Sequence, residues 1–222
     1  MLRELTANDI LFMLQACGWT LLLSLIAFVC GGMLGLVVAI ARTSRSRILR
    51  LAAIVYIQTI QAIPLLILLL LGYYGLSILG YNFGRLNSAG VALSIFTAAF
   101  LGEIWRGCIE AVPKTQWEAA ESLGMSRASQ LIYVILPQAF RISLPPTVGF
   151  MVQVVKGTSL VSVLGFVELT RAGQMVNNAT YLPFIVFSIV GAMYFALCYP
   201  LSKFSRFLER KLNVGRRTVQ GM

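Results

Sequence analysis

The sequence predicts an all-α integral membrane protein with five transmembrane helices. Three observations support this prediction: an apolar composition, five long apolar segments, and basic residues gathered in alternate connecting segments. Of the 222 residues, 58% are hydrophobic and 12% are charged, and the mean hydropathy is +0.82. Soluble domains carry about twice that charged fraction. We therefore expect a single transmembrane domain over residues 1–222.

Five apolar segments are each long enough to cross a hydrocarbon core of about 30 Å, which takes roughly 20 helical residues. The first contains Gly31 and Gly35, a small-xxx-small spacing that permits close helix packing. In the second, Pro64 predicts a kink, because proline removes a backbone hydrogen bond. The expected spans lie at about residues 10–41, 54–79, 89–109, 142–166 and 181–201.

Basic residues are concentrated in three alternate connecting segments. By the positive-inside rule these segments are cytoplasmic, so the N-terminus is expected outside and the C-terminus in the cytoplasm. The same distribution explains the net charge of +10, and we expect contact with membrane lipid and no nucleic acid partner. The three segments hold 14 of the 18 basic residues: Arg42, Arg45, Arg47, Arg50, Arg106, Lys114, Arg127, Arg141, Lys203, Arg206, Arg210, Lys211, Arg216 and Arg217.

Residue types that carry catalysis or hold metals are scarce. Histidine is absent and the apolar segments hold no paired carboxylates, so neither an intramembrane enzyme nor a metal site is expected. A GxxxxGK[ST] loop is also absent, so ATP and Mg would be bound by another protein. We expect no cofactor in this chain and no enzymatic activity of its own. The cysteines lack CxxC spacing and are expected to be buried small hydrophobes: Cys17, Cys30, Cys108 and Cys198.

A polar island between the third and fourth apolar segments predicts a pair of short cytoplasmic helices over about residues 113–140. Thr115 and Glu118 have the spacing of a capping box at the start of the first helix. Gly124 can adopt the left-handed conformation that ends this helix. Ser126 can cap the second helix, which we expect to stop before Pro137.

The first of these helices is predicted to dock against a partner protein. Trp117, Ala120 and Leu123 recur every three residues and give the helix one apolar side. Small side chains at Ala119 and Ala120 permit close approach by another surface. The alternative is an amphipathic helix lying on the inner leaflet, but two glutamates on the helix oppose contact with an anionic lipid face.

The island resembles the EAA loop of permease subunits of ATP-binding-cassette (ABC) importers. In that family, EAA is followed by three residues, glycine, nine residues and I-x-L-P. Here EAA starts at Glu118, the glycine is Gly124, Val134 stands at the position of the isoleucine, and Leu136 precedes Pro137. The resemblance implies that five residues couple the chain to an ATPase: Glu118, Ala119, Ala120, Gly124 and Pro137.

Other motifs resemble the polar amino acid importer branch of this family, and the resemblance covers about residues 54–208. It implies a type I importer (MetI-like) permease fold in the bacterial cytoplasmic (inner) membrane. The implied partners are a cytoplasmic ABC ATPase dimer, a second permease subunit (identical or paralogous), an external solute-binding protein and an amino acid substrate. The motifs are Tyr73–Leu76, Glu103–Gly107, Ser122–Ser126, Leu136–Arg141, Pro145-Pro146 and Thr158–Leu160.

Three positions depart from the pattern of that branch. Gln61 and Ala62 stand where the branch usually has Arg-Gly, and Thr115 stands where it usually has Gly. Gly157 replaces the acidic residue that usually follows the lysine of the fourth span. A heterodimer with one specialised copy would account for this last change.

Lys156 is the one basic residue expected inside a span, near mid-bilayer, where a charge costs roughly 2.5–3.5 kcal/mol. Gly157 weakens the helix there, and Thr158 and Ser159 add hydroxyl groups, so a substrate passage is one interpretation. In that case Lys156 would favour a substrate carboxylate and disfavour a strongly cationic substrate. The other interpretation is an ion pair with a neighbouring acid such as Glu103. The sequence leaves both open.

The alternative function is an ion-gradient-driven secondary transporter of small polar solutes, but such a transporter would require repeated halves and buried acids. Neither is seen in the sequence, and the polar island would have no role.

Glu168 and Arg171, after the fourth apolar segment, are expected in a solvated external loop, with contact to a binding protein as the alternative.

Overall fold

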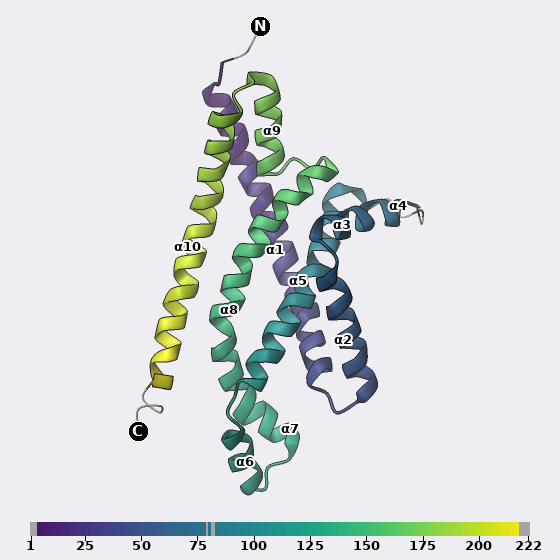
Figure 1. Ribbon diagram of the computed structural model, residues 1–222, viewed down its shortest axis with the longest axis vertical. Coiled ribbons are helices and arrows are strands. Elements are labelled where there is room, and N and C mark those ends of the chain that lie inside the picture. The colour runs from purple at the N-terminus through teal and green to yellow at the C-terminus, as the bar shows by residue number, and fades with distance from the viewer. Residues whose placement is uncertain (1–3, 79, 81–82, 218–222) are drawn as a thin grey trace.

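The computed structural model is helical throughout and contains no strand in the residues it describes, which are 4–78, 80 and 83–217 (Figure 1). The long helices are α1 (Ala7–Thr43), α2 (Arg47–Ala62), α5 (Gly84–Glu110), α8 (Leu136–Gly157) and α10 (Pro183–Arg217). Shorter elements join them: α3 (Leu65–Leu70), the π-helix η1 (Leu71–Gly75), α4 (Leu76–Ile78), α6 (Lys114–Ser122), α7 (Arg127–Ser129), the π-helix η2 (Gln130–Ile135), the 3-10 helix η3 (Thr158–Leu164) and α9 (Leu169–Thr180).

The described helices provide four or five membrane spans. Four helical units are long and apolar enough to cross a bilayer: α1, α5, the run 127–164 and α10. The segment 47–75 makes a fifth span if its two bent halves count as one. The kink predicted at Pro64 is a break, because the two halves meet at 104°. Ile63 takes the extended conformation (φ −95°, ψ 128°) that a residue before proline prefers. The expected end of this span at Leu79 lies outside the described residues.

α1 and α5 pack more closely than any other pair of helices in the described structure. A Cβ atom on Gly31 would lie 2.6 Å from the Cβ of Thr97, and one on Gly35 would lie 3.2 Å from the carbonyl oxygen of Ala98. Both distances are too short for a larger side chain without movement of a helix. The close packing predicted from the Gly31–Gly35 spacing is therefore confirmed.

Aromatic side chains fix α8 against α5. The ring centroids of Phe96 and Phe100 lie 4.6 Å apart, and those of Phe100 and Phe150 lie 5.4 Å apart. Trp105 on α5 donates a hydrogen bond from Nε1 to Oγ1 of Thr147 on α8, at 2.9 Å. Together these contacts hold α8 in a single position relative to α5, so any movement of α8 is transmitted to the centre of the bundle.

The prediction that the second island helix stops before Pro137 is wrong. α7, η2, α8 and η3 form one helical run over residues 127–164. The π-helix lies directly before Pro137, and its wider turn moves the backbone hydrogen bonds, so the missing N–H of proline does not end the helix. The fourth span thus begins before residue 142, and the predicted coupling segment 113–140 includes the first turn of α8.

The external loop predicted around Glu168 is instead the start of a helix, α9. Leu169, Ala172 and Val176 are buried on one side of α9 and pack against α1 and α10. A Cβ on Gly173 would lie 2.6 Å from Cγ2 of Val190 on α10, so these helices are in close contact. This cluster of buried apolar residues lies at the end of the molecule opposite α6 and α7 (Figure 1).

We predict that Gly31→Ala destabilises the protein and that Gly18→Ala, on the same helix, does not. The added methyl at position 31 would overlap Thr97, and overpacking of this kind costs about 1–3 kcal/mol. At position 18 a Cβ atom meets no atom within 4 Å, and alanine favours the helix. Thermal unfolding midpoints in detergent measure the difference. Equal midpoints for the two variants would contradict the packing.

Candidate functional site

Residues 113–135, here called the knob, form a compact projection at one end of the molecule (Figure 1). Its base is apolar: Ile109 and Val112 at the end of α5, with Ile135 in η2, are buried together. Trp117 of α6 packs against this cluster, and Arg127 lies over its ring at 5.5 Å from the centroid. The knob is therefore attached to the ends of both α5 and α8.

Gly124 forms the turn of the knob as predicted. Its φ is +71°, the left-handed region that favours glycine. Its N–H donates to the carbonyl of Glu121 at 2.9 Å, and the N–H of Met125 donates to the carbonyl of Ala120 at 3.2 Å. These two bonds make a Schellman motif, which satisfies carbonyls at the end of α6. The predicted cap at Ser126 is also confirmed, because its Oγ accepts from the N–H of Ser129 at 3.2 Å.

The predicted capping box at Thr115 is wrong. Pro113 has the extended conformation of an N-cap residue (φ −54°, ψ 140°), so α6 begins at Lys114 and Thr115 already lies within its first turn. No side chain caps the start of α6. Proline preorganises the entry to a helix through its fixed φ, and here this preference outweighs the Thr–Glu pattern.

Two of the three EAA residues lie on the outer surface of the knob, and the third is buried. Glu118 and Ala119 are exposed, whereas Ala120 is only 3% exposed and faces the base of the knob. Leu123, predicted to share the apolar side of Ala120, is 81% exposed, because it follows the last residue of α6. Leu123 and Glu118 are therefore both accessible on this projection. Pro137 is also exposed.

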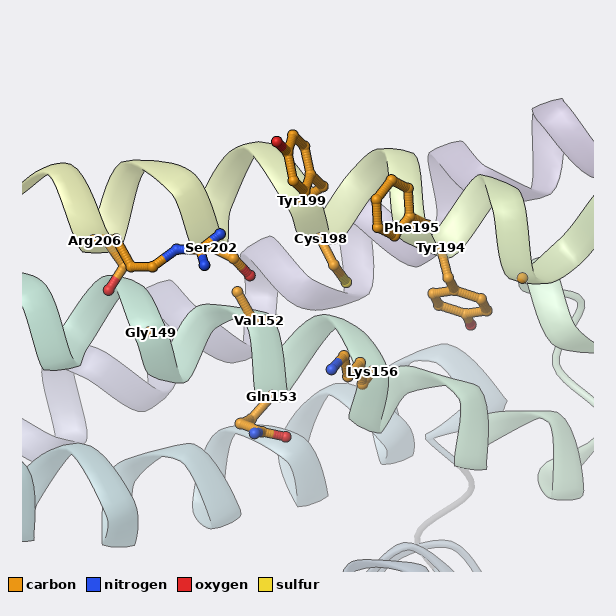
Figure 2. A pocket seen from close by; sticks show the side chains of 12 residues that line it. Gly149, Val152, Gln153, Lys156, Tyr194, Phe195, Cys198, Tyr199, Ser202 and Arg206 are labelled. Carbon is orange, nitrogen blue, oxygen red and sulfur yellow. The ribbon is translucent and has the colours of Figure 1, made fainter.

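A groove of about 730 Å³ lies between α8 and α10 (Figure 2). Lys156, in the last turn of α8, is exposed to this groove, and Arg206 on α10 lines it farther toward the C-terminus. No acidic side chain is among its described lining residues. The groove is lined by Gly149, Val152, Gln153, Lys156, Gly191, Tyr194, Phe195, Cys198, Tyr199, Ser202, Ser205 and Arg206.

The other residues predicted beside Lys156 mark the end of the regular α-helix. α8 ends at Gly157 and continues as a 3-10 helix, so the helix is interrupted at this point. A Cβ on Gly157 would lie 3.0 Å from Cδ2 of Leu65, because α3 approaches closely here. The Thr158 and Ser159 hydroxyls donate to backbone carbonyls within the helix, at 2.7 and 2.6 Å. These three residues are not part of the described groove lining.

Glu103 lies in a charge cluster that does not include Lys156. Its Oε1 accepts from Nε of Arg106 at 2.9 Å, and its Oε2 lies 3.8 Å from Nε of Arg42. Arg106 also pairs with Glu110. The cluster joins the last turn of α1 to α5, so the ion pair of Lys156 with Glu103 that the sequence left open is not formed in this structure.

Glu168 is a polar residue that the sequence analysis placed in solvent and the structure buries completely, at 0% exposure. It is the N-cap residue of α9. Burial raises the pKa of the Glu168 carboxyl, and hydrogen bonds from the Thr170 and Arg171 amides and the Tyr194 hydroxyl offset part of the rise. The apolar spacing of Leu169, Ala172 and Val176 is the signal in the sequence that indicates this helix.

Comparison with known proteins gives a family and several relatives. Residues 31–214 match the family described as binding-protein-dependent transport system inner membrane component. The probable amino-acid ABC transporter permease protein YckA of Bacillus subtilis (strain 168) is 31% identical over 208 residues, which are 94% of this chain and 92% of that protein. The L-cystine transport system permease protein TcyB of the same organism is 36% identical over 196 residues, which are 88% and 84% of the two chains.

Two solved structures share the fold. A chain from the crystal structure of an amino acid ABC transporter with histidines has a TM-score of 0.87 and 34% identity, with 94% of this chain and 100% of that chain covered. An inward-facing MetNI methionine ABC transporter chain has a TM-score of 0.73 at 18% identity, over 94% and 99% of the two chains. The chain belongs to the family of binding-protein-dependent transport system inner membrane components, and it is therefore a transporter subunit and not an enzyme.

Proposed function

We propose that the chain is the permease subunit of an ATP-driven amino acid importer in the bacterial inner membrane. The observation that carries the proposal is the family match over residues 31–214, which spans both the knob and the groove. Relatives named as amino acid, L-cystine and glutamine permeases support it. They favour it over an ion-gradient-driven secondary transporter, which would have no use for a docking surface.

The knob is the surface on which a cytoplasmic ATPase subunit docks. Glu118, Ala119 and Leu123 are exposed, while Ala120 and Gly124 give the knob its shape from within. The chain has no phosphate-binding loop, so a dimer of partner ATPases binds ATP and Mg. A second permease subunit and an external solute-binding protein complete the assembly.

The continuous helical run 127–164 connects this docking surface to the groove. It starts inside the knob at Arg127 and reaches Lys156 without a break in the helix. The run contains the π-helix η2 and the internal Pro145 and Pro146, where a helix can bend, but it is not interrupted between the knob and Lys156. Displacement of the knob by the ATPases therefore moves the wall of the groove that carries Lys156. Two conformations, biased by nucleotide and by the loaded binding protein, then give alternating access.

Lys156 gives the groove its preference for substrates. Its ammonium group can bind the carboxylate that every amino acid carries, in a charge-assisted hydrogen bond. The described lining contains two basic residues and no acidic one, so a second positive charge on the substrate is disfavoured unless the partner subunit supplies an acid. Neutral polar or acidic amino acids are the expected class. The relatives differ in the substrate that their names give, so the individual amino acid is not proposed.

The docking role of the knob predicts that Glu118→Lys abolishes coupling without preventing insertion. The variant should appear in the membrane in normal amount, while ATP-dependent uptake falls at least about ten-fold, as expected for loss of a central contact. Uptake of labelled amino acid into proteoliposomes, with ATPase co-purification, measures this. Glu209→Lys, also exposed but on α10, is the control and should behave as wild type. Normal co-purification and normal activity of Glu118→Lys would contradict the docking role.

The role of Lys156 predicts that Lys156→Met weakens substrate binding to the purified permease–ATPase complex. Loss of a charge-assisted hydrogen bond should raise the dissociation constant about ten-fold or more. The amide of the same amino acid, which lacks the carboxylate, should bind equally to both forms. Calorimetric titration without the binding protein separates this effect from selection by that protein. Lys203→Met, on an exposed part of α10, is the control.

Two results would contradict the role of Lys156. A homodimeric complex that binds arginine or lysine more tightly than any neutral amino acid would contradict a groove whose described charges are all positive. Equal affinity of wild type and Lys156→Met for the amino acid would contradict contact with the carboxylate.

A further inference from the structure

Glu168 is a buried carboxylate that the proposed function does not use. It lies between η3 and α9 and is 0% exposed. Its Oε1 accepts from the N–H of Arg171 at 2.8 Å, and its Oε2 accepts from the N–H of Thr170 at 2.9 Å and from the hydroxyl of Tyr194 at 2.9 Å. One carboxylate therefore holds both the first turn of α9 and a side chain of α10.

No cation in the described structure pairs with this carboxylate. The Arg171 guanidinium donates to Oε1 of Gln174 at 3.1 Å and turns away from it. The titratable groups near it on the other helices are Cys17 on α1 and Tyr194 on α10. Hydrogen-bond donors alone compensate the buried charge, so each donor, including the Tyr194 hydroxyl, matters for its stability.

The start of α9 is also attached to α1. The N–H of Leu169 donates to Oγ1 of Thr20 at 3.2 Å. This bond is independent of the carboxylate, so α9 stays anchored to α1 when the contact of Glu168 with α10 changes. The contact between Glu168 and Tyr194 is thus a separate link, from α9 to α10.

Tyr194 belongs to two sites at once. It lines the α8–α10 groove with Lys156 and Cys198 (Figure 2). Its hydroxyl also donates its single proton to Oε2 of Glu168, so it has no proton for a second bond. The hydroxyl of Thr170, at 3.0 Å from that of Tyr194, is then the donor of their shared bond. The position of Tyr194 in the groove wall is therefore set from α9.

We propose that Glu168 is a positioning residue that couples the α8–α10 groove to α9, through its hydrogen bond with Tyr194. A change in the groove that moves the α10 wall is transmitted to α9, and a contact made on the exposed side of α9 is transmitted to the groove. α9 lies at the end of the molecule opposite the knob (Figure 1), so the link extends from the groove toward that end. Its consequence for transport rests on the proposed function.

A role limited to helix capping does not explain this residue. Serine, threonine, aspartate and asparagine are the favoured N-cap residues, because their short side chains reach the first-turn amides. The longer side chain of Glu168 reaches those amides and also the hydroxyl of a residue on another helix. Glu168→Asp should therefore keep the cap and lose the link, which separates the two roles.

The test uses the reactivity of Cys198, a groove residue that is 7% exposed and lies one turn from Tyr194. The background is the assembled complex carrying Cys17→Ala, Cys30→Ala and Cys108→Ala. We expect Tyr194→Phe and Glu168→Asp each to raise the rate of alkylation by N-ethylmaleimide about ten-fold, the effect of losing one hydrogen bond to a charged group.

The double variant and a matched tyrosine decide whether one link is involved. Glu168→Asp with Tyr194→Phe should react no faster than Tyr194→Phe alone, because Tyr194→Phe already removes the bond that Glu168→Asp breaks. Tyr199→Phe is the control: Tyr199 lines the same groove, and its hydroxyl makes no hydrogen bond in the described structure. It should react as wild type. Equal rates for Tyr194→Phe and Tyr199→Phe, or multiplicative effects in the double variant, would overturn the proposal.

Substrate affinity is the second readout, measured by calorimetry on the same complexes with a neutral amino acid that the wild type binds. Tyr194→Phe and Glu168→Asp should change the affinity in the same direction at unchanged yield of complex. Altered substrate affinity with unaltered Cys198 reactivity would contradict the link, because the change in affinity would then not pass through the groove wall. If the wild type binds and transports no amino acid, the proposed function fails, while Cys198 reactivity still decides the link.

Discussion

The continuity of the helical run 127–164 is the constraint on which the rest of this structure depends. The run begins in the knob, contributes Phe150 to the central core, and ends beside Lys156 and the groove. The π-helix before Pro137 shifts the backbone hydrogen bonds in this region, and the run continues through the proline. This continuity links the knob to the wall of the groove.

Small residues have different physical roles at different points of the chain. Gly31 and Gly35 let α1 approach α5, whereas Gly124 supplies a left-handed turn with open space around it. Ala120 is buried, whereas its neighbour Ala119 is exposed. Within the EAA pattern, one alanine therefore serves the packing of the knob, and the other is open on its surface.

Composition and motif spacing predicted the all-helical membrane fold, the close packing at Gly31 and Gly35, the turn at Gly124 and the cap at Ser126, because each follows from composition or from the chemistry of a residue in its local sequence. The failures have a common cause. The start of α6 at Pro113, the passage of the helix through Pro137 and the burial of Glu168 each depend on competition between local preferences or on contacts across the fold. No local pattern shows that Tyr194, 26 residues away, will donate to Glu168.

Three charged sites follow one another along the molecule, and they differ in how the charge is compensated. Near the knob, Glu103 and Glu110 face Arg106 and Arg42, so the positive and negative charges of this cluster are equal in number. Lys156 is exposed to the groove and has no acidic neighbour in the described lining, so its charge is available to a ligand. Glu168 is sealed from solvent and satisfied by hydrogen bonds alone. A movement that starts at the knob can reach α9 through α8, the groove and Tyr194, because each of these contacts the next. Lys156, whose charge is open to the groove, thus lies between two charged sites that hold helices together.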